Sequence, residues 1–172
     1  MKNQTRLTRS GRPVWSGAPS SGVAMYKRIL VPLDGSELAE SALPHAAALA
    51  RGLESQIRLV RVNIADEFVY GPAGQVAPYA DEVLERDRQE AVAYLGRIRA
   101  RLQHPGLAVI TEVLKGPVAQ AIIEYAAAQQ IDLIVMSTHG RSGLNRLIFG
   151  SVAEKVLQGA RCPTLIVRGP SA

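Results

Sequence analysis

The sequence predicts an α/β domain built on a mainly parallel sheet. Short runs of β-branched residues alternate with longer segments of helical period from Lys27 onward, which is the pattern of βαβ units. The chain has 172 residues, of which 47% are hydrophobic, and this suffices for one core but leaves little room for two. We therefore expect one open five-stranded sheet with helices on both faces.

The first strand is expected at residues 28–33, where an almost continuous apolar run indicates burial on both faces. Ser36 can cap the next helix, which should run to residue 51 with Gly52 as its stop signal. Pro44 removes one hydrogen bond inside this helix and should kink it. Residues 57–63 are expected to form the second strand.

Residues 64–80 contain Gly and Pro without a clear period, which predicts either a mobile loop or a functional flap. A long amphipathic helix is expected over residues 81–102, where acidic residues among the arginines favour a solvated face over a nucleic-acid stripe. The remaining elements are strand 108–114, a helix opened by Gly116 and Pro117, strand 132–136, helix 151–157 and strand 164–167.

The net charge of +5 comes mostly from one end of the chain. Residues 1–24 contain four of the 20 basic residues and no acid, so the other 148 residues carry 16 basic and 15 acidic side chains. The domain is nearly neutral, and the charge gives no indication of nucleic-acid binding there. We expect a disordered extension at 1–24 and a domain at 25–170. A targeting peptide is a weaker interpretation of the composition of residues 1–24. Translation could also begin at Met25.

Cysteine content and apolar run length exclude further classes. A single Cys162 rules out an intrachain disulfide framework and a Cys-based zinc site. The longest apolar runs, such as residues 133–136, are far too short to span a bilayer. We expect a soluble cytoplasmic protein.

Residues 137–151 are the candidate site. Gly140 and Gly143 let the backbone bend and approach a ligand closely, and Thr138, Arg141 and Ser142 can add hydrogen-bond donors, which suits phosphate. Ser151 and Glu154 match a capping box, and the same helix start offers amides to an anion, so a cap alone and a cap plus ligand both stay open. Neither a P-loop nor a G-x-G-x-x-G fingerprint occurs in the chain.

This segment resembles the universal stress protein family. ATP-binding members carry G-x2-G-x9-G-[ST] after their fourth strand, and here Gly140, Gly150 and Ser151 match the second half while Ser137 replaces the first glycine. K-R-I-L-V-P-L-D-G-S at residues 27–36 and R-C-P-T-L-I-V-R at residues 161–168 are similar to the family's first and last strands. The resemblance covers residues 26–168.

The resemblance implies a Rossmann-like fold, similar to the adenine nucleotide alpha hydrolases, with strand order 3-2-1-4-5 and ligands at the switch point between strands one and four. It further implies a homodimer through residues 164–167, bound ATP, and Mg²⁺ held at Asp34, directly or indirectly; without the resemblance, Asp34 reads equally as a turn residue. The residues expected at the nucleotide are Pro32, Leu33, Asp34, Val62, Met136, Ser137, Thr138, His139, Gly140, Arg141, Ser142, Gly143, Gly150, Ser151 and Val152.

The leading hypothesis is an ATP-binding stress or signalling protein that acts through nucleotide-dependent conformation or choice of a protein partner. Neither a catalytic lysine nor paired carboxylates accompany the loop, so we assign no catalytic residue and expect at most slow ATP hydrolysis. The alternative is a nucleotide-free dimeric interaction module of the same fold, in which Ser137 and residues 64–80 mark a lost or blocked pocket. A nucleotidyl-transfer enzyme would need an S-G-G-x-D-S-type loop, which Asp34-Gly35-Ser36 does not supply.

Overall fold

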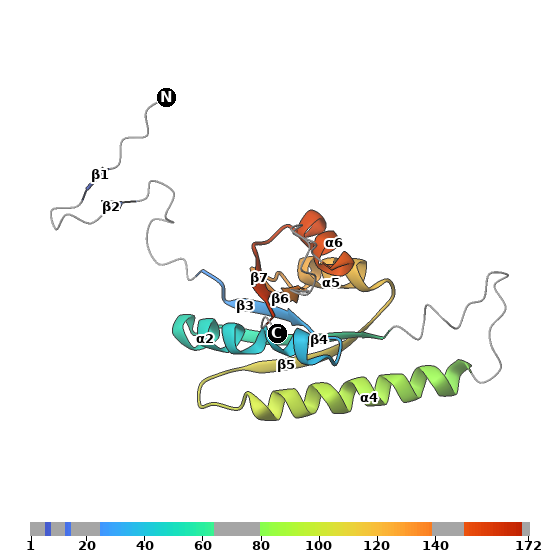
Figure 1. Ribbon diagram of the computed structural model, residues 1–172. Coiled ribbons are helices and arrows are strands. Elements are labelled where there is room, and N and C mark those ends of the chain that lie inside the picture. The colour runs from blue at the N-terminus through green and yellow to red at the C-terminus, as the bar shows by residue number, and fades with distance from the viewer. Residues whose placement is uncertain (1–5, 8–12, 15–24, 64–79, 139–149, 170–172) are drawn as a thin grey trace.

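Five parallel strands form the central sheet of the computed structural model, which describes residues 6–7, 13–14, 25–63, 80–138 and 150–169. The strand order is β5-β4-β3-β6-β7 (Figure 1), which confirms the expected order 3-2-1-4-5. In chain order, the strands of this sheet are β3 (Arg28–Pro32), β4 (Gln56–Asn63), β5 (Val109–Lys115), β6 (Leu133–Thr138) and β7 (Thr164–Arg168).

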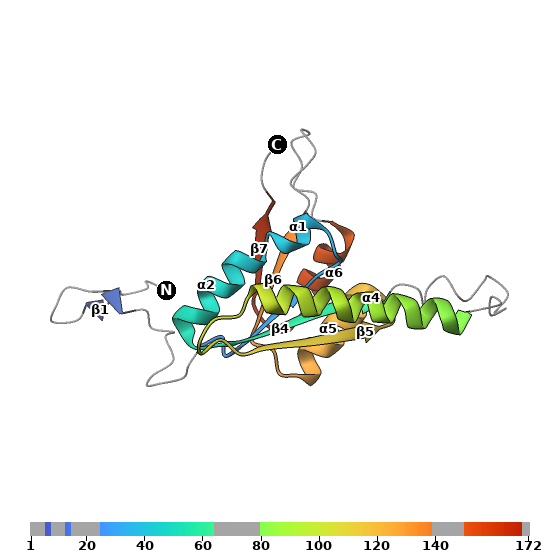
Figure 2. The same cartoon turned by 90° about the horizontal axis from the view of Figure 1, so that it is seen from below.

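Helices cover both faces of the sheet (Figures 1 and 2). One face packs against α1 (Glu37–Glu40), α2 (Leu43–Leu53) and α4 (Ala80–Arg101). The other packs against α5 (Val118–Ala128) and α6 (Ser151–Gly159). Each face therefore has its own apolar core, and the sheet separates the two.

The central strand β3 contributes to both cores. Ile29 and Val31 face α2 and α4, and Leu30 between them faces α5 and α6. All three side chains are 0% exposed. The predicted burial of this strand on both faces is confirmed, and it follows from the period of two in a β-strand.

The helix predicted after β3 is divided in two. Ser36 caps α1 as expected, because its Oγ accepts a hydrogen bond from the Ala39 N–H at 3.0 Å. The break at residues 41–42 puts Pro44 in the first turn of α2, where a missing N–H removes no intrahelical bond. The predicted helix is thus interrupted just before Pro44, and Pro44 lies in the first turn of the second helix.

Gly52 is not the stop signal of α2, so this prediction is wrong. The helix continues through Gly52 to Leu53, and Glu54 takes the left-handed conformation with φ of 53°. The Lys27 ammonium group donates to the carbonyl oxygens of Leu53 at 2.8 Å and Glu54 at 3.4 Å. These bonds satisfy carbonyl groups that a helix end leaves without intrahelical partners.

The long helix α4 begins and ends one residue before its predicted bounds. Ala91, Leu95 and Ile98 are buried against the sheet, whereas its arginines are exposed. Arg88 and Glu85 form an ion pair at 2.8 Å on the outer face. This mixture of charges confirms the prediction of a solvated face.

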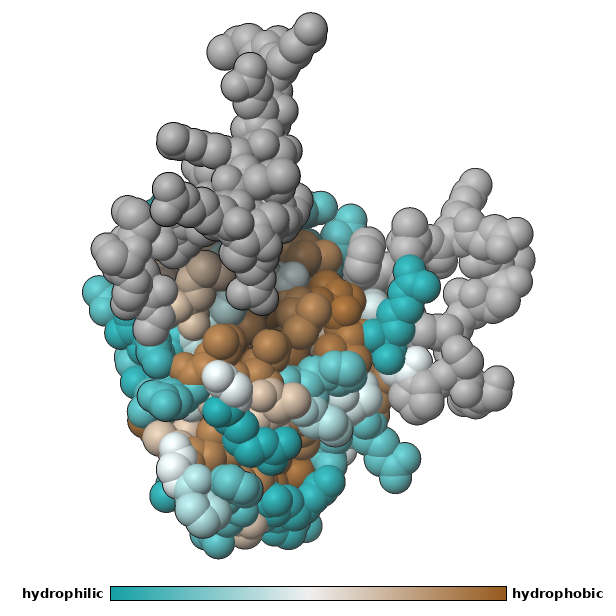
Figure 3. Space-filling view, turned by 90° about the vertical axis from the view of Figure 1, so that its left-hand side faces the viewer, coloured by the Kyte–Doolittle hydropathy of each residue, from teal (hydrophilic) through white to brown (hydrophobic). Residues whose placement is uncertain are grey.

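The sheet has β7 at one end, where the described residues pair it only with β6. Leu165 on β7 is 38% exposed. Figure 3 shows apolar residues gathered in a band on the side of the molecule toward which α2 and β7 lie in Figure 1. This band is the least polar part of the described surface in that view.

Two short segments lie before the domain. β1 (Arg6–Leu7) and β2 (Pro13–Val14) pair antiparallel. The other residues of 1–24, and residues 64–79, lie outside the described residues, so the predictions of a disordered extension and of a flap stay untested. Within the described part of the chain, no helix is both long and apolar enough to cross a membrane.

Replacing Leu30 with alanine should lower the free energy of unfolding by about 2–5 kcal/mol, because the cavity would lie between the sheet and α5. Denaturant unfolding measures this loss. Leu157→Ala is the matched control: Leu157 is 38% exposed, and we expect a loss below about 1 kcal/mol. Equal losses for both variants would contradict the described packing of β3.

Candidate functional site

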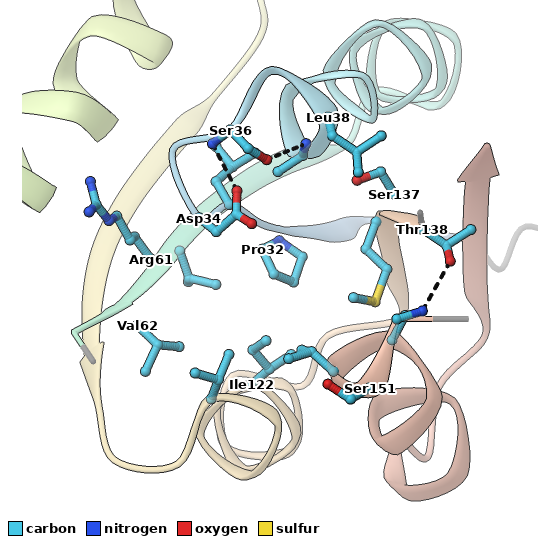
Figure 4. A pocket seen from close by; sticks show the side chains of 18 residues that line it. Pro32, Asp34, Ser36, Leu38, Arg61, Val62, Ile122, Ser137, Thr138 and Ser151 are labelled. Carbon is cyan, nitrogen blue, oxygen red and sulfur yellow. Dashed lines mark hydrogen bonds between the residues drawn. The ribbon is translucent and has the colours of Figure 1, made fainter. Parts of the chain in front are cut away.

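A pocket of about 230 Å³ lies at the carboxyl ends of β3, β4 and β6 (Figure 4). The chain leaves β3 toward α1 and α2 on one face, and after β6 it reaches α6 on the other face. Because β3 and β6 are neighbours, these opposite connections leave a crevice between them. The pocket is therefore at the topological switch point that the sequence predicted.

The described part of the predicted site comes together around this pocket. All ten predicted residues that the structure describes line it: Pro32, Leu33, Asp34, Val62, Met136, Ser137, Thr138, Gly150, Ser151 and Val152. The other five, His139, Gly140, Arg141, Ser142 and Gly143, lie outside the described residues. Contact of these fifteen residues with a nucleotide stays a prediction.

The strand ends that form the floor are held together by backbone pairing. Pro32 is the last residue of β3, where a missing N–H is tolerated. The next amide, that of Leu33, donates to the Val60 carbonyl at 2.8 Å and so prolongs the contact with β4 beyond the strand. The floor of the pocket is thus continuous with the hydrogen-bonded sheet.

The predicted capping box at Ser151 and Glu154 is wrong. Gly150 is the N-cap of α6. Glycine has no side chain, so no side-chain hydrogen bond caps this helix. Ser151 is the first helical residue, and the Glu154 N–H donates to the Gly150 carbonyl at 3.0 Å as in a regular helix. The Glu154 carboxylate accepts from the Gln158 amide at 3.4 Å instead.

This cap changes what α6 offers to the pocket. Gly150, Ser151 and Val152 all line the cavity, and their amides belong to the end of the helix that carries partial positive charge. The Gly150 N–H donates to Thr138 Oγ1 at 3.3 Å, which ties the start of α6 to the end of β6. Such a helix start suits an anionic ligand.

Asp34 lies on the opposite side of the pocket from Thr138 (Figure 4). Its Oδ1 accepts a hydrogen bond from the Ser36 N–H at 2.8 Å, so the carboxylate does shape the turn before α1. Asp34 is exposed, and this bond uses only one of its two oxygens. The turn role and a ligand contact are therefore compatible.

Sequence reasoning missed Arg61, which lies on β4 between the buried Val60 and Val62. Its place in the strand directs it to the face of α4, because neighbouring residues of a strand point to opposite faces. A charge inside a β-branched run, near the carboxyl end of a strand beside β3, was the available signal. Also missed were Ser36, Leu38, Ala39, Val60, Val118, Ile122 and Ala153.

Arg61 belongs to a small polar cluster behind the pocket. Its guanidinium carbon lies 5.5 Å from the centre of the Tyr94 ring. The Tyr94 hydroxyl donates to Glu40 Oε1 at 3.1 Å, and the Arg101 guanidinium donates to Glu40 Oε2 at 2.6 Å. Burial raises the pKa of Tyr94 above its ordinary value, and the negative charges of Glu40 and Asp34 raise it further. The phenol therefore stays protonated and acts as a donor.

The described residues contain no group of three or more His, Cys, Asp or Glu side chains placed to hold a metal ion. Asp34 is the only carboxylate among the residues that line the described pocket. A cation at this site would therefore need further oxygen ligands from a bound molecule or from water.

Comparison with known proteins supplies the family. The sequence profile of the universal stress protein family matches residues 25–168. The chain belongs to the universal stress protein family. Universal stress protein MJ0531 of Methanocaldococcus jannaschii is 36% identical over 150 residues, which cover 87% of this chain and 86% of that protein.

Solved structures of universal stress proteins share this fold. MJ0577 of Methanocaldococcus jannaschii superposes with a TM-score of 0.70 at 27% identity, and the match covers 86% of this chain and 99% of that one. UspA of Lactobacillus plantarum gives a TM-score of 0.64 at 25% identity, over 84% of this chain and 99% of that one. The five-stranded parallel sheet with helices is thus the universal stress protein fold.

Ser36 and Ser151 of this universal stress protein both lie at helix starts, but only Ser36 caps its helix. Ser36→Ala should lower the free energy of unfolding by about 1 kcal/mol, because it leaves the Ala39 amide without its acceptor. Ser151→Ala should change it by less than about 0.5 kcal/mol. Denaturant unfolding of the two variants measures both changes. A larger loss of unfolding free energy for Ser151→Ala than for Ser36→Ala would support the capping box after all.

Proposed function

We propose that this chain is an ATP-binding universal stress protein, which acts in stress response or signalling through nucleotide-dependent conformation or partner binding. We further propose that it works as a cytoplasmic homodimer. One observation carries the proposal: the switch-point pocket joins Pro32, Asp34 and Val62 to the uncapped start of α6. This pocket offers apolar walls, one carboxylate and helix amides in a single cavity.

These features match the three parts of a nucleotide. Pro32, Val62, Met136 and Ile122 supply an apolar wall on which a purine ring can pack. Asp34 supplies an acceptor for ribose hydroxyl groups. The amides at Ser151 and Val152 suit phosphate oxygens, because they lie at the amino end of a nine-residue helix.

Proteins of this fold have been solved with adenine nucleotides. One is a universal stress protein family protein of Arabidopsis thaliana with AMP bound, at a TM-score of 0.60. Others are a universal stress protein of Archaeoglobus fulgidus in complex with dAMP and a universal stress protein in complex with cAMP. At 14–20% identity they share the fold with this chain, and they support an adenylate as its ligand.

Mg²⁺ fits the proposal as a companion of the phosphates. This ion usually takes one or two carboxylates and completes its coordination with phosphate oxygens and water. Asp34 can provide one such carboxylate from the wall of the pocket.

The alternative, a nucleotide-free interaction module, expects Ser137 to mark a lost pocket. Ser137 lies within β6, opposite Val167 of β7, and it is absent from the residues with positive φ. A serine therefore adopts this backbone without strain, and the described residues around it line a cavity. Both observations favour nucleotide binding, although the module would also explain the apolar side shown in Figure 3.

Purified protein should bind Mg·ATP in calorimetry and release nucleotide when it is heat-denatured. Gly150→Val should abolish binding, because a branched side chain would enter the pocket where phosphate approaches. Gly96→Val is the control: Gly96 lies on α4, and an added carbon there meets nothing within 4 Å. The proposal fails if the wild-type protein neither binds Mg·ATP at millimolar concentration nor releases nucleotide.

Leu165→Arg should convert the dimer into a monomer, because it places a charge on the outer strand that we propose to pair with a second copy. Sedimentation velocity measures the change. Leu157→Arg makes the same replacement at a leucine with the same 38% exposure, on α6, and should leave the dimer intact. A dimer that survives in the Leu165 variant, or a wild-type monomer, would contradict the assignment.

A further inference from the structure

A second cavity lies beside the switch-point pocket, in the groove between α5 and α6. Its volume is about 600 Å³. Val118, Ser151 and Val152 line both cavities, so the two meet at the starts of these helices. Figure 4 shows Ile122 of α5 and Ser151 of α6 on the same side of the pocket. The groove therefore continues from the end of the pocket at which α6 begins.

The length of the groove follows from the packing of the two helices. A carbon added to Gly159, the last residue of α6, would lie 2.6 Å from Ile123 Cδ1 of α5, which is closer than real side chains approach. Glycine thus lets the end of α6 pack directly on α5. Both Ser151 and Gly159 line the groove, so at 1.5 Å per residue it runs for about 12 Å along α6. An extended chain of about three to four residues has this length.

The described residues that line the groove are apolar or uncharged except for one lysine, Lys155. Val118, Ala119, Ile123 and Val152 supply apolar surface from both helices. None of the described lining residues is aromatic, so a second nucleobase would find no ring on which to stack. None is acidic either, so the groove does not repel a ligand that carries phosphate at its entrance.

The two glutamines of the groove, which are exposed, are oriented by carboxylates of their own helices. Gln120 Nε2 donates to Glu124 Oε1 at 2.6 Å, and Gln158 Nε2 donates to Glu154 Oε1 at 3.4 Å. Within the described residues, no hydrogen bond reaches the two amide oxygens, and no hydrogen bond or ion pair involves the Lys155 ammonium group. The groove thus offers an acceptor from each helix and one donor.

An arm that contains amide groups is the chemical partner that uses all of these features. An amide N–H can donate to a glutamine oxygen, and an amide C=O can accept from the lysine. The carbons between successive amides can pack on the apolar residues and leave water. A carboxylate or phosphate in the groove would use the lysine alone, because such groups present only acceptors.

We propose that the groove between α5 and α6 binds an amide-containing arm attached to the terminal phosphate of an adenine nucleotide. A phosphate at the amides of Ser151 and Val152 would lie where the two cavities meet, so a group esterified to it can enter the groove directly. This inference rests on the proposed nucleotide-binding function. It adds a class of ligand, adenine nucleotides esterified at their last phosphate, and a second binding surface for it.

Calorimetry with ADP, dephospho-coenzyme A and diadenosine diphosphate tests the inference. Dephospho-coenzyme A is ADP with an amide-containing arm on its second phosphate, and diadenosine diphosphate has adenosine at the same position and an equal phosphate charge. The wild-type protein should bind dephospho-coenzyme A at least about tenfold more tightly than either of the others, because only its arm makes both hydrogen bonds and apolar contacts in the groove. An advantage below about threefold, or tighter binding of diadenosine diphosphate, would overturn the inference.

Gln120→Trp places a large side chain in the groove at a residue that does not line the pocket. It should bring the affinity for dephospho-coenzyme A to within about threefold of that for ADP and leave ADP binding unchanged. Gln89→Trp is the matched control: Gln89 is also exposed and donates to a carboxylate of its own helix, Glu85, at 3.0 Å, but it lies on α4. This variant should keep the wild-type ratio. An unchanged ratio in Gln120→Trp, or an equal loss in both variants, would contradict binding of the arm in the groove.

Two failures are distinguishable. If the wild-type protein binds neither Mg·ATP nor any of the three ligands, the proposed function fails and the inference fails with it. If it binds ADP but gains less than about threefold from the arm, nucleotide binding stands and only the inference about the groove is overturned. The wild-type comparison needs no variant, so it decides the matter even if Gln120→Trp does not fold.

Discussion

The site depends on one topological constraint. β3 and β6 are neighbours in the sheet, and the described helices that come after them, α1 and α2 after β3 and α6 after β6, pack on opposite faces, so the carboxyl ends of the two strands border one crevice. Pro32, Asp34, Ser137 and Thr138 reach the same cavity for this reason, although about a hundred positions separate the two pairs in the chain. Ile29, Leu30 and Val31 are buried in the two cores and so keep β3 in place beside β6.

The two sides of the cavity are built by different means. On the side of α6, backbone groups dominate: the Gly150 amide bonds Thr138 Oγ1, and the helix amides that follow have no side-chain cap. On the side of α1 and α4, side chains dominate, with Arg61 held against Tyr94 and Asp34 held by the Ser36 amide. Backbone amides at a helix start suit anions, whereas the side chains across the cavity are held by contacts to α1 and α4.

The strands, their order and most of the described pocket could be predicted from the sequence. The strands follow from the local repeat of apolar residues, and the order and the pocket from the family resemblance. It failed where contacts between distant parts of the chain decide the structure. Ser151 and Glu154 match a capping box, yet Gly150 takes the cap position and ties itself to Thr138, a contact across twelve positions that local pattern does not encode. Arg61 was missed because a charge in a strand has meaning only once its neighbours β3 and α4 are known. Residues 139–143 lie outside the described residues, so their part in the site remains a prediction.

The polar cluster behind Arg61 connects two helices on the same face of the sheet. Arg61 contacts Tyr94 of α4, Tyr94 donates to Glu40 of α1, and Glu40 accepts from Arg101 near the end of α4. Burial and the nearby Glu40 carboxylate raise the pKa of Tyr94, so its phenol is a hydrogen-bond donor. The Glu40–Arg101 pair is largely exposed on the arginine side, and such pairs contribute about 0–1 kcal/mol. Arg61, Tyr94, Glu40 and Arg101 thus link α1 to α4 through contacts of which the exposed ion pair is a weak one.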